Sequence, residues 1–237
     1  MYRIKKIGKR ISAVSYKQFI DFTRNKKMLL IFFIFPILYI VLKIVAGKEF
    51  GSDGSSFILM HSILVPLLIT ATIVAEEKEK GTLKLLIMSG VKAYEYFIGI
   101  AFSMMGFIIA GMLLFELSGA TSSFDAVFVA VFTILADIIS MFIGAVIGRI
   151  TANQTNVGPI AVPVTLLIFF APMLQQIKPE FTFPSKYLYS GILLKIMSTC
   201  TYSHRDIFWM GVNFAMILIL FLLVFNTKNL IKSVSHS

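Results

Sequence analysis

The sequence predicts an all-α polytopic membrane protein with six transmembrane helices, an N-terminal amphipathic interfacial helix and a short outer re-entrant element between spans five and six. Hydrophobic residues make up 57% of the 237 residues, charged residues make up only 14%, and the mean hydropathy is +0.86. Because a soluble domain carries about 25% charged residues, this chain has too little charge to cover a water-facing surface. The second observation is a series of six long apolar runs, and the third is the uneven distribution of basic residues around them.

The six apolar runs match the length of about 20 residues that a helix needs to cross a bilayer. They cover residues 28–46, 54–75, 96–115, 126–148, 150–177 and 207–227. Lys43 falls inside the first run, where its long side chain can reach the membrane surface. A short polar hinge at residues 149–156 marks the junction of the fourth and fifth runs. We therefore expect a six-span domain over residues 28–227, followed by a cytoplasmic tail at 228–237.

The basic residues predict the orientation of the spans. The net charge is +10, and 16 of the 22 Lys and Arg residues lie on the side of the membrane that holds both termini. Because Lys and Arg collect on cytoplasmic loops, both termini are expected on the cytoplasmic side of a cell (plasma) membrane, with an even number of spans. The net positive charge is then explained by the orientation of the spans, and no nucleic-acid partner is expected. A cleaved secretory signal is disfavoured, because the first apolar run begins only at Met28.

Residues 1–27 are expected to form the interfacial helix. The apolar residues Ile4, Ile7, Ile11 and Val14 recur at helical spacing, with basic residues between them. This pattern is typical of an amphipathic helix that lies on the inner leaflet, with membrane lipid as its partner. The alternative is a solvated basic segment that only retains the N-terminus inside the cell.

The loop at residues 76–92 begins with five charged residues that follow the second apolar run. Gly81 is expected to end the preceding helix as its C′ residue, and Thr82 is expected to cap a new short helix over residues 83–88. That helix is strongly apolar although it lies on the aqueous side, which favours docking to a partner protein. A position in the membrane interface is the alternative, and the residues alone favour neither.

Residues 172–206 are expected to form the outer re-entrant element. Pro172 closes the fifth apolar run, and a series of Pro and Tyr residues follows, with Pro184 among them. The apolar pieces in this segment are too short to span a membrane, so re-entrant or interfacial helices on the outer face are expected.

Small residues recur within the apolar runs. Gly144 and Gly148 are four residues apart in the fourth run, and Gly106 lies in the third run. Such residues permit close helix contact, so both runs are expected to pack against neighbouring spans.

The sequence contains no signature of an enzyme. It lacks the G-x-x-x-x-G-K-[ST] loop of an ATPase, the H-E-x-x-H pair of a zinc protease and the G-x-S-x-G elbow of a hydrolase. The three His residues are scattered, so no metal site and no bound cofactor are expected in this chain.

Asp137 is the only acid deep within an apolar run. An intramembrane carboxylate is a candidate for a proton or cation site or for a substrate contact, so Asp137 is the residue expected in a translocation path. The alternative is a packing role, in which Asp137 is neutral or is hydrogen-bonded to Ser140 or Thr133.

The loop at residues 76–92 resembles the cytoplasmic loop of the permease subunits of ABC type-2 exporters. In that family an acidic and basic strip is followed by Gly-Thr-Leu and then by a short apolar helix. The residues that carry the resemblance here are Glu77, Lys78, Glu79, Gly81, Thr82, Leu83, Leu85, Leu86 and Ser89. The six spans, the N-terminal helix and the proline-rich outer element extend it. The sequence departs from the family at Lys84, where Glu is common, and at Gly90, where Pro is common.

The resemblance implies a transporter subunit that is not itself an enzyme. Two permease chains, identical or different, would assemble with two separate ATPase subunits that bind ATP and Mg. The segment 77–89 would act as a coupling helix in a groove of the ATPase, and the N-terminal helix would be a second contact. The substrate would be amphipathic (a drug, an antimicrobial peptide or a lipid-like molecule). Two other classes stay open: an ion-coupled secondary carrier that uses Asp137, and a non-transporting membrane scaffold.

Overall fold

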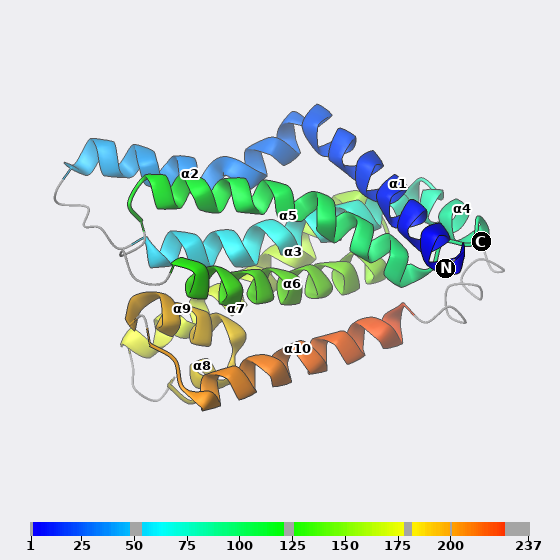
Figure 1. The fold of residues 1–237 in the computed structure, drawn as a ribbon. Coiled ribbons are helices and arrows are strands. Elements are labelled where there is room, and N and C mark those ends of the chain that lie inside the picture. Colours follow the sequence, from blue (N-terminus) through cyan, green and yellow to red (C-terminus); the bar gives the residue numbers. More distant parts are fainter. Residues whose placement is uncertain (1, 48–53, 121–125, 178–181, 200, 226–237) are drawn as a thin grey trace.

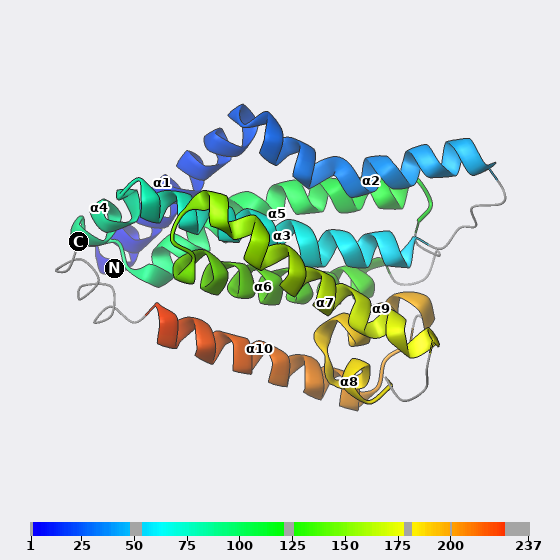
Figure 2. The ribbon, with the colours of Figure 1, turned by 180° about the vertical axis from the view of Figure 1, so that it is seen from behind.

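The computed structural model describes residues 2–47, 54–120, 126–177, 182–199 and 201–225, and every regular element within these ranges is a helix. Figures 1 and 2 show the long helices lying side by side along one direction. In chain order the elements are α1 (Tyr2–Arg24), α2 (Lys26–Ala46), α3 (Ser55–Glu79), α4 (Thr82–Met88), α5 (Ala93–Leu117), α6 (Ala126–Ile150), the 3-10 helix η2 (Gln154–Asn156), α7 (Val157–Ile177), α8 (Thr182–Tyr187), α9 (Tyr189–Thr199) and α10 (His204–Val224).

Six of these helices are long and apolar enough to cross a membrane, namely α2, α3, α5, α6, α7 and α10. Each has 21 to 25 residues, which at 1.5 Å per residue is about the 30 Å thickness of a hydrocarbon core. For the described residues, the prediction of an all-α chain with six helices apolar enough to cross a membrane is therefore confirmed.

The start of the fifth span differs from the prediction. Helix α6 continues through Ile150, and α7 begins only at Val157, so the predicted start at residue 150 is wrong. The reason is local, because the Asn153 side chain accepts a hydrogen bond from the Asn156 backbone N–H (3.1 Å) and caps η2. The predicted end of the sixth span, Thr227, lies outside the described residues.

The turn between α3 and α4 confirms one prediction and corrects another. Gly81 has a φ of 70°, which favours glycine, and it ends α3 as expected. Thr82 is not the cap of α4 but its first residue. The Leu85 N–H donates to the Gly81 carbonyl (3.2 Å), so Gly81 occupies the cap position, and the Thr82 hydroxyl donates back to the Glu77 carbonyl (3.1 Å).

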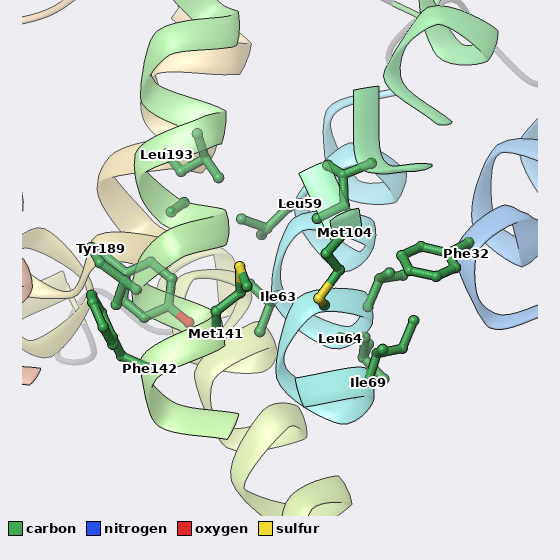
Figure 3. Packing of buried hydrophobic residues seen from close by; sticks show 14 of the residues in the cluster. Phe32, Leu59, Ile63, Leu64, Ile69, Met104, Met141, Phe142, Tyr189 and Leu193 are labelled. Atoms are coloured by element: carbon green, nitrogen blue, oxygen red, sulfur yellow. The ribbon is translucent and has the colours of Figure 1, made fainter. Parts of the chain in front are cut away.

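Helix α3 is the centre of the bundle and contacts α2, α4, α5, α6, α7 and α9. Its closest neighbour is α6, since a Cβ atom on Gly144 would meet the Leu67 carbonyl oxygen and one on Gly148 would meet that of Ala71. Figure 3 shows buried side chains of both helices in the same core, with Ile63 of α3 near Met141 of α6. The small residues at these two positions therefore allow the backbones to touch.

Helix α1 packs lengthwise on α5 rather than standing apart. Val14 is buried against Gly99, where an added Cβ would lie 2.7 Å from the valine side chain, and Phe22 meets Phe107 with ring centroids 5.7 Å apart. Ile7 and Ile11 are half-buried, and only the backbone of Ile4 is described. Part of the apolar stripe that the sequence assigns to lipid thus contacts protein.

The short helices α8 and α9 lie at the end of the bundle opposite α4 (Figures 1 and 2). With 6 and 11 residues, neither is long enough to span a membrane. Pro172, expected in the outer element, is buried within α7, which continues to Ile177. Pro184 lies in α8, and its side chain is outside the described part of the chain. Helix α1 begins and α10 ends at the α4 end of the bundle.

Candidate functional site

Glu77 lies at the α4 end of the bundle and connects α3 to α1. Its side chain is only 6% exposed, and one carboxylate oxygen accepts hydrogen bonds from Lys17 Nζ (2.6 Å) and from Gln18 Nε2 (2.7 Å). Gln18 is itself buried. Because a charge removed from water is tolerated only with close partners, this pair of contacts fixes the position of α1 on α3.

The next two residues connect α3 to the linker between α6 and α7. Lys78 Nζ donates to the backbone carbonyls of Arg149 (3.1 Å) and Thr151 (2.7 Å). A carboxylate oxygen of Glu79 accepts from the Gln154 backbone N–H (2.9 Å). The charged strip is therefore a set of structural contacts made by the last turns of α3, and it links three parts of the chain.

A second polar contact holds α1 on α5. Arg10 and the buried Glu95 form an ion pair at 3.5 Å, and Glu95 also accepts from the Lys92 backbone N–H (3.0 Å). Farther along the two helices, the Ser103 hydroxyl donates to the Ser15 carbonyl (2.5 Å). Together with the Glu77 contacts, these bonds attach α1 to two different spans.

Helix α4 has one buried side and one exposed side. Leu83 is 6% exposed and belongs to the main apolar cluster, whereas Leu85 and Met88 are 65% and 73% exposed. The Ser89 hydroxyl donates to the Leu86 carbonyl (2.7 Å) just beyond the last turn. Beside this helix, the Glu76 carboxylate pairs with Lys80 and raises the pKa of that ammonium group. An exposed apolar surface next to paired charges is typical of a protein docking surface.

The sequence-predicted coupling residues therefore gather at one end of the bundle, but they divide into two groups. Glu77, Lys78 and Glu79 make internal contacts. Leu85 in α4 and Ser89, just beyond the end of α4, are exposed. Sequence analysis missed the partners of the first group, which are Lys17, Gln18, Arg149, Thr151 and Gln154. In the sequence, Lys17 is only one of the basic residues that predict the topology, and no spacing rule relates residues 59 to 75 positions apart.

Asp137 lies far from this site, in the middle of α6, and is fully buried. Neither carboxylate oxygen has a hydrogen-bond partner in the described part of the chain, and the Ser62 side chain of α3 is the polar group beside it. The alternative of a hydrogen bond from Asp137 to Ser140 or Thr133 is not found. Ser140 pairs with the Tyr189 hydroxyl (2.9 Å) and Thr133 donates to the Val129 carbonyl (2.8 Å), so both hydroxyls are engaged elsewhere.

We expect Asp137→Asn to leave the protein folded and active. A carboxyl group buried without a partner is expected to be neutral, and the amide is a neutral group of the same shape that can also pair with Ser62. The free energy of unfolding should change by less than about 1 kcal/mol. Denaturant unfolding in detergent micelles and transport in vesicles measure the two quantities, with Asp137→Leu as the variant that removes all polarity. A complete loss of transport by Asp137→Asn would instead support an ion-coupled carrier.

The comparisons with known proteins add no assignment. No family model matches the chain, and no curated protein is significantly similar to it. Within the described residues, no group of three or more His, Cys, Asp or Glu side chains is arranged to hold a metal ion.

Proposed function

We propose that this chain is the permease subunit of an ABC-type exporter, which moves an amphipathic substrate across the membrane with a separate ATPase subunit. One observation carries this proposal: the central helix α3 continues beyond its apolar run and leads through the Gly81 turn into α4, whose exposed Leu85 and Met88 are the surface offered to a partner. A force applied to α4 would act directly on the helix that contacts most other spans.

The contacts of Glu77 and Lys78 supply the next step of the proposed mechanism. If the ATPase moves α4, the end of α3 moves with it, and Glu77 takes α1 along while Lys78 takes the linker between α6 and α7. ATP binding by the partner would favour one arrangement of the bundle only if the complex binds ATP more tightly in that arrangement than in the other. The coupling thus depends on a rigid connection, which buried and paired charges provide.

The composition of the proposed transport unit comes from the resemblance of the loop at residues 76–92 to that of the ABC type-2 permeases. Two copies of the chain, or this chain and a related one, would form the transport unit, with ATP and Mg bound by the ATPase. The basic residues favour a topology with both termini in the cytoplasm, where the ATPase would reach α4, and the resemblance to the exporter family implies a bacterial cell (plasma) membrane. A drug, an antimicrobial peptide or a lipid-like molecule would suit the apolar spans.

We expect Leu85→Asp to abolish stimulation of the partner ATPase. The substitution places a charge at the centre of the exposed apolar surface of α4, where it would lose hydration on docking, and a loss of at least tenfold is expected. Leu85→Met is the matched control, since it keeps the apolar surface and should retain most of the stimulation. The measurement is ATP hydrolysis by a candidate partner ATPase, with and without the reconstituted permease.

The result separates three classes of function. ATPase stimulation that depends on Leu85 supports the exporter. Transport that survives ATP depletion and stops with Asp137→Asn would replace it with an ion-coupled carrier. Binding of a partner through α4 without any transport would leave a membrane scaffold.

A further inference from the structure

A polar groove lies where α1 meets α2, on the flank of the bundle. It encloses about 800 Å³, a size within the range of ligand-binding clefts, between the C-terminal half of α1, the first turn of α2 and the end of α3. Met28 and Ile73 form its apolar floor. In Figure 1 the α1–α2 bend projects from the side of the bundle, away from α4.

The charges that line this groove do not cancel. Lys17 pairs with Glu77 at 2.6 Å and lies 4.0 Å from Asp21, and Lys80 pairs with Glu76. The groove's three acids therefore all have a basic neighbour. The other three cations of the lining are exposed and have no ion-pair partner in the described part of the chain: they are Arg24, Lys26 and Lys27. The groove thus offers three free positive charges and invites an anionic ligand.

The position of the groove along the spans identifies the source of that anion. Lys26 is the first residue of α2, and Glu76 directly follows the apolar run of α3 at residues 54–75. Both mark the level where a hydrocarbon core of about 30 Å ends and lipid headgroups begin. An open groove with free cations above an apolar floor fits a phosphate headgroup together with the first part of its acyl chains.

We propose that the groove between α1, α2 and α3 is a binding site for an anionic phospholipid headgroup, with Arg24, Lys26 and Lys27 as its cationic contacts. If these three residues only retained the N-terminus in the cytoplasm, the chain would not need to bind one lipid headgroup more tightly than another. This proposal is independent of the ATPase and of the transported substrate, because it concerns only the chain and its bilayer.

The test measures lipid binding to the full chain purified in a neutral detergent. Dioleoylphosphatidylglycerol and dioleoylphosphatidylcholine are titrated separately and the bound lipid is counted by native mass spectrometry. Phosphatidylglycerol is expected to bind more tightly. The triple variant Arg24→Gln, Lys26→Gln, Lys27→Gln should lose roughly fivefold in affinity for each charge removed, or on the order of 100-fold in total.

The matched control is the triple variant Lys6→Gln, Lys9→Gln, Lys84→Gln. It removes the same charge from exposed positions that do not line the groove, and its phosphatidylglycerol affinity should stay close to that of the unmodified chain. An equal loss in both triple variants would overturn the proposal, because the lipid would then respond only to net charge. Competition by millimolar inorganic phosphate alone would also overturn it, since a free anion rather than a lipid would be the ligand.

A variant with the opposite expected sign keeps the test informative if the triple variant fails to fold. Asp21 is exposed, lines the groove and lies at the 4.0 Å limit from Lys17. Asp21→Asn removes this negative charge, so phosphatidylglycerol affinity should rise severalfold. A fall in affinity would contradict an anion site at this position.

Discussion

Gly144→Ala should destabilise the protein by about 3 kcal/mol, with a fall of about 10 °C in the apparent Tm. The single added methyl group would meet the backbone carbonyl of Leu67, and a backbone atom of a packed helix cannot move aside as a flexible side chain can. The substitution therefore has to separate α3 from α6, which is the largest helix contact in the bundle. Thermal unfolding followed by circular dichroism in detergent micelles measures the effect.

Gly106→Ala is the control for this prediction, because it makes the same chemical change in another span. No atom lies within 4 Å of the Cβ that it would add, and its position on α5 is exposed. Since alanine favours a helix over glycine, the Tm should stay the same or rise slightly. An unchanged Tm for Gly144→Ala would mean that α3 and α6 are not in backbone contact.

The contrast between these two glycines shows what the sequence can and cannot predict. Six apolar runs of about 20 residues predict six spans, because length and apolarity alone decide whether a helix suits a membrane. The runs do not identify which face of a span meets which neighbour. Gly106 and Gly144 are both small residues within apolar runs, yet only Gly144 lies against another backbone.

In the candidate site, too, local backbone features could be predicted from the sequence, whereas contacts between distant residues could not. The Gly81 turn could be predicted, since positive φ is a local property of glycine. The role of Thr82 was predicted wrongly because the hydroxyl bonds to Glu77, five residues earlier, rather than to its own helix. The contact between Lys17 and Glu77 joins residues 60 positions apart, so no local rule could find it.

Glu77→Ala is expected to loosen the C-terminal half of α1 on α3 and to cost about 2 kcal/mol of stability. It removes the acceptor shared by Lys17 and Gln18 and leaves the buried Gln18 amide without that partner. Breaking a fully buried ion pair costs about 3–5 kcal/mol. The expected loss of stability is smaller here because Lys17 is 45% exposed and retains part of its hydration. Hydrogen exchange of the α1 amides, together with chemical unfolding, measures both effects.

Glu76→Ala is the matched control, since it changes the same residue type one position earlier. Its partner Lys80 is exposed, and a surface ion pair contributes at most about 1 kcal/mol, so hydrogen exchange in α1 should not change.

A double-mutant cycle that combines Glu77→Ala with Lys17→Ala then isolates the ion pair between these two residues. The double variant should lose about 1 kcal/mol less stability than the sum of the losses of the two single variants. Additive costs, or slow α1 exchange in Glu77→Ala, would show that the apolar contacts with α5 hold α1 in place without this carboxylate. If the cycle does show coupling, α1 and α3 are energetically linked at this end of the bundle, which the proposed transmission of force from an ATPase requires.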